Sequence, residues 1–334
     1  MRCLVTGTAG FVGFHLARRL LDAGHQVTGI DGLTPYYDPK LKQARHAELA
    51  RFGSFHPHIC MLEEAGRLGA VYEQAAADVV LHLAAQAGVR YSLDNPRAYI
   101  DSNIVGSFNL LELCRRSPPR HLLIASTSSV YGDSTDFPLA ETGPSDHPLS
   151  LYAASKKAVE AIAHSYAHVW DIPTTLFRFF TVYGPWGRPD MAHFKFAERI
   201  LAGRPIDIYN HGQMERDFTY IDDLVEAIVR LSDLSPIRGG AKAAATDSSS
   251  RSAPYRIVNI GGGQPVKLLD FVEEIERATG RKAIRNYMDM QPADVVRTEA
   301  STDFLEALID YRPTTPLSVG IAEFVRWYRG YYQV

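Results

Sequence analysis

The chain begins with an apolar run that ends at a glycine-rich turn and passes directly into a helical pattern. Three evenly spaced glycines, Gly7, Gly10 and Gly13, lie where the strand-like RCLVTG passes into the helix-like FVGFHLARRLLDAG. Glycine can adopt positive φ and lets another backbone approach closely, and the free N–H groups at a helix start attract phosphate groups. The turn therefore predicts a strand–turn–helix unit with a pyrophosphate site at its first loop.

An acidic residue ends the next strand-like run, QVTGID. Asp31 stands at the distance from the glycine turn at which a carboxylate meets an adenosine ribose. A carboxylate there repels a 2′-phosphate, so the pattern favours NAD over NADP. The alternative is a tight strand–helix turn with incidental glycines. The residues predicted to contact the dinucleotide are Gly7, Gly10, Phe11, Val12, Gly13, Asp31, Leu83, Ala84 and Ala85.

Strand-like and helix-like runs alternate through the first half of the chain. Later strand-like runs are DVVLHLA, HLLIAS and TTLFRFF, and helical patterns cover 102–116 and 151–170. Such alternation predicts an α/β fold with a doubly wound parallel (Rossmann) sheet. Beyond about residue 185 the pattern becomes patchier, which predicts a smaller mixed α/β C-terminal lobe that binds the substrate.

The sheet and the lobe are predicted to interleave along the chain. Residues 1–184 would form the NAD-binding Rossmann domain, to which a later segment, about 211–260, returns. Residues 185–334 would form mainly the substrate-binding lobe. Residues 235–254 are rich in Gly, Ala and Ser, and we expect a flexible insertion at the surface there.

Charge and cysteine content exclude several classes of function. The formal net charge is −3, with 35 Lys and Arg against 38 Asp and Glu, so we expect no nucleic acid and no membrane surface among the partners. No apolar run is long enough to span a bilayer, and the glycine turn comes too early for a signal peptide. Cys3, Cys60 and Cys114 are odd in number and form no CxxC pair, which predicts reduced thiols in a cytoplasmic protein and no metal site.

A tyrosine and a lysine stand four residues apart in YAASK, so a helix would place Tyr152 and Lys156 on one face. A free tyrosine has a pKa of about 10, but a nearby ammonium and a positive nicotinamide would favour the phenolate. Tyr152 would then take a proton from a hydroxyl while hydride leaves the same carbon for NAD. An ordinary surface Tyr and Lys are the alternative. Their position after a glycine turn favours a catalytic pair that also contacts the cofactor.

These features resemble the extended short-chain dehydrogenase/reductase superfamily, and within it the NAD-dependent nucleotide-sugar epimerases and dehydratases. The resemblance is greatest to bacterial UDP-glucuronic acid 4-epimerases and runs along nearly the whole chain. It implies that Thr127 and Tyr152 contact the 4-hydroxyl of the sugar and that Lys156 also holds the nicotinamide ribose. The motifs that carry it are TGTAGFVG, HLAAQAGVRYS, SNIVGSFNLLELC, STSSVYG, YAASKKAVE, RFFTVYGPWGRPDMA and GQMERDFTYIDDLVEA.

The resemblance also assigns the nucleotide end of a UDP-sugar. It implies that Arg216 binds the diphosphate and Asp294 lies near the uridine ribose, with Arg90 a further substrate contact. Two positions depart from related enzymes. Met61 stands where family members usually have an Asp near the adenine, and Thr181 stands where galactose-type epimerases have Asn, which speaks against a neutral hexose.

Hydroxyl residues fill the run 126–129 at the end of the strand-like HLLIA. Related dehydratases carry Asp-Glu where this chain has Ser128 and Ser129, and decarboxylases carry Glu at the second position, so the groups for elimination are absent. An oxidised uronic acid is a β-keto acid that loses CO₂ readily. We therefore predict that Ser128, Ser129 and Thr181 hold the sugar carboxylate out of alignment, with Arg188 as the nearby cation. Hydroxyls satisfied by the backbone and a solvated arginine are the alternatives.

The sequence thus predicts an isomerase. Its reaction would be the reversible C4 epimerisation of UDP-glucuronic acid to UDP-galacturonic acid through a 4-keto intermediate, with hydride held transiently on tightly bound NAD. The alternatives are a UDP-glucose or UDP-N-acetylhexosamine 4-epimerase, a UDP-glucuronate decarboxylase, and a non-catalytic NAD-binding regulator. The stretch SNIVGSFNLLELC resembles helices through which relatives dimerise, which predicts a homodimer. A face packed within the chain is the other interpretation.

Overall fold

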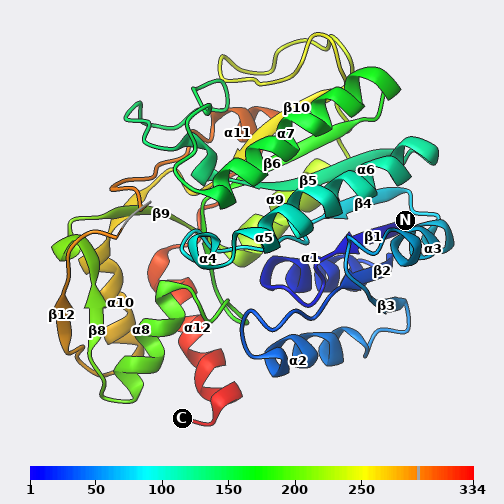
Figure 1. Ribbon diagram of the computed structural model, residues 1–334. Helices are drawn as coiled ribbons and strands as arrows, with labels where there is room; N and C mark the ends of the chain where they lie inside the picture. The colour runs from blue at the N-terminus through cyan, green and yellow to red at the C-terminus, as the bar shows by residue number, and fades with distance from the viewer. Residues whose placement is uncertain (292–293) are drawn as a thin grey trace.

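The computed structural model describes residues 1–291 and 294–334 and is built around a seven-stranded sheet (Figure 1). Its strand pairs are parallel, as predicted for a doubly wound fold. Winding proceeds in opposite directions from the centre and reverses between β1 and β4. Across the sheet the strands run in the order β10 (Tyr255–Ile260), β6 (Thr174–Phe179), β5 (His121–Thr127), β4 (Val79–His82), β1 (Arg2–Thr6), β2 (Gln26–Asp31) and β3 (Phe55–Ile59).

The central strands are buried on both faces, which is why they form continuous apolar runs in the sequence. Every residue of β4 and β5 is buried. Successive residues of β1 contribute to different apolar clusters, because Leu4 packs in one and Val5 in the other. This alternation follows the pleat of the strand and gives the sheet a hydrophobic core on each side.

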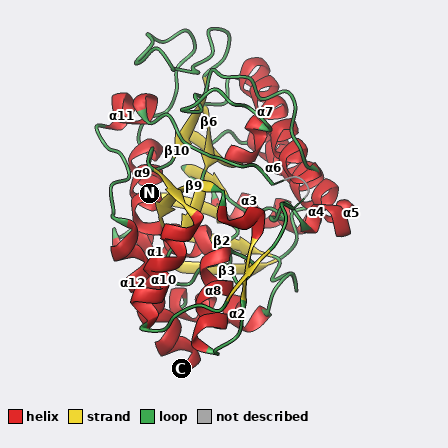
Figure 2. Cartoon of the chain, turned by 90° about the vertical axis from the view of Figure 1, so that its left-hand side faces the viewer, coloured by secondary structure: helices red, strands yellow, loops and turns green. Residues whose placement is uncertain are grey.

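Helices cover both faces of the sheet (Figure 2). One layer consists of α1 (Phe11–Asp22), α2 (Pro39–Leu49), α9 (Ile221–Ser232) and α11 (Asp303–Ile309). The other consists of α3 (Ala65–Ala75), α4 (Tyr91–Asp94), α5 (Pro96–Tyr99), the π-helical η1 (Ile100–Val105), α6 (Gly106–Arg116) and α7 (Leu151–Trp170). The helix predicted over 151–170 is confirmed as α7, whereas the one predicted over 102–116 divides into the end of η1 and α6.

A smaller lobe follows the large sheet and confirms the predicted α/β architecture with a second, mixed part. One three-stranded sheet joins an antiparallel and a parallel pair, and a two-stranded parallel sheet lies in the same lobe. Its helices pack in a separate apolar cluster. The elements are β7 (Thr181–Tyr183), α8 (Ala192–Leu201), β8 (Ile206–Ile208), η3 (Tyr209–Gly212), β9 (Glu215–Tyr220), β11 (Pro265–Lys267), α10 (Leu268–Thr279), β12 (Arg285–Tyr287) and α12 (Leu317–Tyr332).

Elements from late in the chain contribute to both parts. Strand β10 forms the edge of the large sheet, and α9 packs against α1, whereas β9 lies in the small sheet between β7 and β11. The division into a domain of residues 1–184 with about 211–260 and a lobe of residues 185–334 stays a prediction.

Residues 235–254, for which we predicted a flexible insertion at the surface, form an irregular segment without helix or strand. Arg238 donates to the carboxylate of Asp171 at 3.0 Å. Asp247 accepts hydrogen bonds from two backbone N–H groups within the segment, those of Ala243 at 2.7 Å and Ser249 at 2.6 Å. These contacts hold the segment against the end of α7 and fold it onto itself.

Among the residues that the structure describes, no helix is both long and apolar enough to cross a membrane. The same residues contain no group of His, Cys, Asp and Glu side chains that could hold a metal ion. Cys3, Cys60 and Cys114 are free thiols in buried positions.

Candidate active site

A cavity of about 260 Å³ lies where the winding of the sheet reverses, at the carboxyl ends of β1 and β4. Open α/β sheets bind their ligands at this point. The predicted cofactor residues and the predicted catalytic residues therefore meet in one cavity. The predicted residues in its wall are Gly7, Gly10, Phe11, Val12, Gly13, Asp31, Leu83, Ala84, Ala85, Thr127, Tyr152, Lys156 and Arg188.

The glycine turn packs so closely that side chains are excluded from it. Gly7 has φ +83°, and a Cβ there would lie 2.8 Å from the nitrogen of Ala84. The N–H of Gly10 donates to the oxygen of Gly7 at 2.9 Å. A Cβ on Gly13 would lie only 2.0 Å from that same oxygen. Gly7 and Gly13 thus leave no room for a side chain, and a Cβ on Gly10 would lie 3.0 Å from the Gly7 oxygen.

The start of α1 fits the predicted pyrophosphate. Gly10 precedes the helix and provides no side-chain cap. The helix's backbone hydrogen bonds begin with Phe14 N–H to Gly10 oxygen at 3.0 Å. The N–H groups of Phe11, Val12 and Gly13 come before that bond and so have no partner within the helix, which is how helix starts bind anions.

Asp31 connects the glycine turn to the loop that follows β2. Its carboxylate accepts from the N–H of Ala9 at 2.9 Å and from the N–H of Leu33 at 2.8 Å. Each carboxylate oxygen has a second lone pair, so Asp31 can still accept the hydroxyls of a ribose. Met61, at the position that departs from the family, also lines the cavity. The residues present therefore fit NAD, with a thioether where related enzymes have a carboxylate.

Replacing Gly13 by alanine is expected to weaken NAD binding. Because the new Cβ would lie 2.0 Å from the Gly7 oxygen, the turn must shift, at a cost of about 1–3 kcal/mol. The NAD dissociation constant should rise about ten- to a hundredfold, measured by calorimetry on protein freed of cofactor. Gly66→Ala is the matched control, because a Cβ there meets nothing within 4 Å. Equal affinity in the two variants would remove the glycine turn from the NAD site.

Tyr152 and Lys156 lie in the first two turns of α7. Ser150 caps this helix by accepting the N–H of Ala153 at 3.2 Å, which fixes where the helix begins. Lys156 is 4% exposed, and both it and Tyr152 line the cavity. A single helix start therefore sets the position of both predicted catalytic side chains.

The pKa values of this pair differ from the prediction in one respect. Burial raises the pKa of Tyr152, and a hydrogen bond with Thr127 and the charge of Arg188 offset this only in part. Burial lowers the pKa of Lys156 to about 8, against the opposing charge of Glu160. The side chains alone thus favour the phenol, so the predicted lowering of the Tyr152 pKa requires the positive charge of the nicotinamide.

The hydroxyls of 126–129 divide between structural and open positions. Ser126 donates to the buried carboxylate of Glu160 at 2.6 Å. Thr127 caps η2 (Ser128–Tyr131) by accepting the N–H of Ser129 at 3.2 Å, and it also donates to the Ser129 hydroxyl at 3.2 Å. The interpretation that backbone and neighbouring groups satisfy one or two of these residues therefore holds for this part of the run.

The predicted carboxylate contacts do not all lie in the cavity wall. Arg188 is in it, whereas Ser128, Ser129 and Thr181 are half-buried outside it. A sugar that reaches these three hydroxyls has to extend beyond the cavity. Their contact with a uronic acid stays a prediction.

Arg188 is already paired with an acid that the sequence analysis missed. Its Nε donates to Asp190 Oδ1 at 3.0 Å, and its Nη2 donates to Oδ2 at 2.5 Å. The hydroxyl of Tyr36 also donates to Asp190, at 3.0 Å. Burial acts against both charges, but each partner stabilises the charge of the other. The pKa of Arg188 is therefore raised and the pKa of Asp190 is lowered.

The three residues predicted for the nucleotide end lie near one another but outside the cavity wall. Arg90 forms an ion pair with Asp294 at 2.8 Å and lies over the ring of Tyr209, 4.5 Å from its centroid. Arg216 donates to the carbonyl of Val295 at 2.6 Å. Burial lowers the pKa of Arg216, and the charge of Asp294 opposes this. The structure thus brings the three together, and their roles stay predictions.

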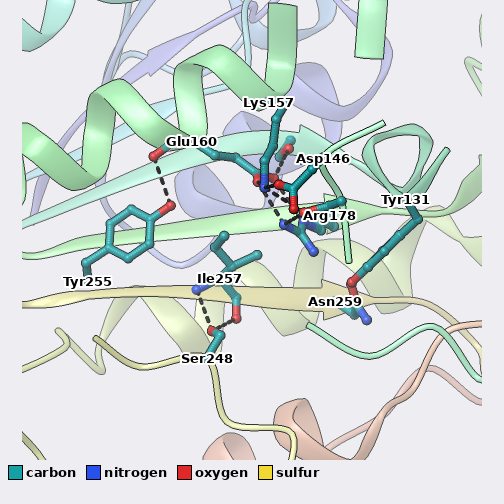
Figure 3. A network of polar contacts seen from close by, with 11 residues as sticks. Tyr131, Asp146, Lys157, Glu160, Arg178, Ser248, Tyr255, Ile257 and Asn259 are labelled. Atoms are coloured by element: carbon teal, nitrogen blue, oxygen red, sulfur yellow. Dashed lines mark hydrogen bonds and ion pairs between the residues drawn. The ribbon is translucent and has the colours of Figure 1, made fainter. Parts of the chain in front are cut away.

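A buried ion pair behind Ser126 was also missed. Glu160 projects from α7 toward Arg178 on β6 (Figure 3) and accepts from its Nε at 2.9 Å and its Nη2 at 2.8 Å. Both side chains are 2% exposed. The guanidinium of Arg178 lies over the ring of Tyr131 at 4.6 Å. The only signal in the sequence is that Glu160 follows Lys156 by one helical turn.

Asn103 is a further missed residue, and it joins the cavity wall to the backbone of Tyr152. Its side chain accepts the N–H of Gln86 at 2.7 Å and donates to the hydroxyl of Ser155 at 2.9 Å. Ser155 in turn donates to the carbonyl of Tyr152 at 2.8 Å. Asn103 lies in the π-helical η1, and such insertions in helices often occur at functional sites.

A reversal point that combines a glycine turn, a strand-end acid and a Tyr–Lys pair in the cavity wall defines a dinucleotide-binding protein of the Rossmann type. Comparison with known families agrees with this class. The model of the "NAD dependent epimerase/dehydratase family" matches residues 3–237. The chain belongs to this family.

Individual relatives are similar over nearly the whole chain. A Rhizobium meliloti (strain 1021) protein named "Probable UDP-glucuronate 4-epimerase" is 58% identical, covering 98% of this chain and 97% of that protein. "UDP-glucuronate 4-epimerase 3" of Arabidopsis thaliana is 46% identical, covering 98% of this chain and 76% of that protein. The solved structure of UDP-glucuronic acid 4-epimerase from Bacillus cereus, in complex with UDP-glucuronic acid and NAD, aligns with a TM-score of 0.89 at 31% identity, covering 99% and 100% of the two chains. The predicted resemblance is thereby confirmed.

Proposed function

We propose that this protein is an NAD-dependent UDP-glucuronate 4-epimerase that interconverts UDP-glucuronic acid and UDP-galacturonic acid. The observation that carries the proposal is the meeting of Thr127, Tyr152 and Lys156 in one cavity with the glycine turn. The names of the relatives support the choice of sugar. The absence of acids at Ser128 and Ser129 supports epimerisation over dehydration.

The positions of the side chains support the following catalytic roles. NAD, when bound, supplies the acceptor and later the donor of a hydride. Tyr152, with its hydroxyl toward Thr127, takes the proton of the sugar's 4-hydroxyl and later returns it. Lys156 holds the nicotinamide ribose and, as an ammonium, stabilises the phenolate of Tyr152. Because the pKa of Lys156 is about 8, that ammonium is lost as the pH rises through this value, and turnover should fall on the alkaline side.

The carboxylate of the substrate must be controlled while C4 is a ketone. A β-keto acid loses CO₂ when its C–C bond aligns with the carbonyl π system. Arg188 in the cavity wall supplies the cation for this carboxylate, and Ser128, Ser129 and Thr181 supply hydroxyl donors farther out. Together they would fix a carboxylate orientation that resists decarboxylation.

The direct test uses purified protein with UDP-glucuronic acid and no added cofactor, with the products separated by isomer. We expect UDP-galacturonic acid to form until the two isomers are at equilibrium, because the bound NAD is regenerated in each cycle. UDP-glucose should not be converted at a comparable rate. A UDP-pentose as main product would assign a decarboxylase, and rapid UDP-glucose conversion would assign a neutral-hexose epimerase.

We also propose that the protein is a cytoplasmic homodimer that associates through α6 and α7. These two helices pack against each other. Large apolar side chains are exposed along and beside them, among them Val105 at 38%, Phe108 at 46% and Trp170 at 42%. Helix pairs of this kind would join as a four-helix bundle, and the mass of the protein in solution tests this.

A further inference from the structure

The pairing of Arg188 with Asp190 has a consequence for how the cavity treats an anionic sugar. Nε and Nη2 of the guanidinium are engaged by the carboxylate of Asp190. Within residues 1–291 and 294–334, Nη1 of Arg188 has no hydrogen-bond partner. The side chain lines the cavity. A sugar carboxylate therefore meets a cation that is partly neutralised and offers only its outer N–H groups.

Asp190 is held in place from the cofactor side of the cavity. Tyr36, in the loop after β2, donates to its Oδ2 at 3.0 Å, across 154 residues of sequence. Arg45 of α2 fixes the segment before Arg188 by donating to the carbonyl of Trp186 at 2.6 Å. The same guanidinium donates to the carbonyl of Ala9 in the glycine turn at 2.7 Å. The Asp190–Arg188 pair is thus fixed by the fold and does not need the sugar to assemble it.

We propose that Asp190 weakens the hold of Arg188 on the sugar carboxylate so that the 4-keto sugar can turn over within the site. This inference rests on the proposed function. Epimerisation requires the keto sugar to present its other face to the same hydride, so its carboxylate has to leave its contacts once in every conversion. An unpaired, partly buried arginine would bind that carboxylate in a fork and slow the turn.

The turn breaks the contact between Arg188 and the sugar carboxylate, so this contact stabilises the bound keto sugar but not the transition state of the turn. Binding that is shared equally by the bound state and the transition state lowers KM without raising kcat. A contact that is lost in the transition state lowers KM and kcat together. Asp190 removes part of this attraction while Arg188 still selects an anionic sugar. Asp190 is therefore a specificity-determining and positioning residue that acts through Arg188.

The test is Asp190→Asn in the NAD-loaded protein, which keeps the shape of the side chain and removes its charge. We expect KM and the dissociation constant for UDP-glucuronic acid each to fall about tenfold, and kcat to fall about tenfold with them. The dissociation constant of UDP-glucose, which has no carboxylate, should not change. A residue with a merely structural role would raise KM, or would affect both sugar nucleotides alike.

A double-mutant cycle shows whether Asp190 acts through Arg188. In an Arg188→Gln background, Asp190→Asn should leave the affinity for UDP-glucuronic acid unchanged. Glu323→Gln, which removes an acid paired with Arg326 on the exposed face of α12, is the control and should behave as the parent protein. Melting temperature and NAD affinity confirm that each variant is folded.

The outcomes separate this inference from the proposed function. If the parent protein does not convert UDP-glucuronic acid, the proposed function is wrong, and the affinities of the charged and neutral sugar nucleotides still report on Asp190. If the parent protein converts it but Asp190→Asn weakens its binding or leaves it unchanged, the inference about Asp190 is overturned.

Discussion

Replacing Tyr152 by phenylalanine will lower turnover of UDP-glucuronic acid about a hundred- to ten-thousandfold, the usual contribution of a positioned acid–base group. The variant loses only the hydroxyl that exchanges the proton, and the ring keeps its place against Tyr99, 6.1 Å away between centroids. NAD should therefore bind as before. The rate of isomer formation measures the first effect, and calorimetry with NAD measures the second.

The same helix offers a matched control for this variant. Tyr166, farther along α7, donates its hydroxyl to Glu112 at 2.6 Å, and it does not line the cavity. Tyr166→Phe makes the same chemical change at a distance from the sugar and should retain turnover. Equal turnover in the two variants would refute the acid–base role of Tyr152.

The features of the fold that depend on neighbouring residues were predictable from the sequence. Helix α7 is an example, because Ser150 is a strong cap and an apolar face repeats from Leu151 to Trp170. Strand β2 is another, since QVTGID is a short run with three β-branched residues that ends in an acid. The π-helical η1 could not be predicted in this way. Its sequence has an ordinary helical pattern, and its Asn103 bonds to groups 17 and 52 residues away in the sequence.

The site was predictable where a motif carries the chemistry. The glycine turn, Tyr152 and Lys156 could be named because their spacing is tied to a turn or a helix face, whereas Thr127 was implied by the resemblance to the epimerases. The long-range hydrogen bonds could not. Arg45 contacts Trp186 across 141 residues, and Tyr36 contacts Asp190 across 154. Periodicity contains no information about such pairs, since they form only when the small lobe packs against the cofactor side.

The pKa of Tyr152 could not be predicted from the sequence for the same reason, because it depends on the completed fold. Spacing alone places an ammonium near the phenol, which predicts a lowered pKa. Burial is a property of the completed fold, and it raises the pKa of Tyr152. Burial also lowers the pKa of Lys156 to about 8. The first shift disfavours the phenolate and the second disfavours the ammonium, so the pair depends on the positive nicotinamide to form a phenolate.

Glu160→Gln will destabilise the protein by about 3–5 kcal/mol, because it leaves the charge of Arg178 without its partner in the interior. The carboxylate of Glu160 receives two hydrogen bonds from Arg178 and one from Ser126. Burial alone would lower the pKa of Arg178, but Glu160 raises it, so the arginine stays charged in the native protein. Urea denaturation, with the midpoint and slope compared with the parent protein, measures the loss.

A surface pair provides the control for this prediction, and the pH profile provides a second measurement. Glu274 pairs with Arg277 on α10, with 21% and 68% of their side chains exposed, so Glu274→Gln should cost about 1 kcal/mol or less. Because the charge of Glu160 raises the pKa of Lys156, its loss should also move the alkaline fall of turnover to lower pH. If Glu160→Gln were as stable as Glu274→Gln, the buried pair would not hold α7 against β6. If stability fell but the pH profile stayed the same, the pair would support the fold without tuning the lysine.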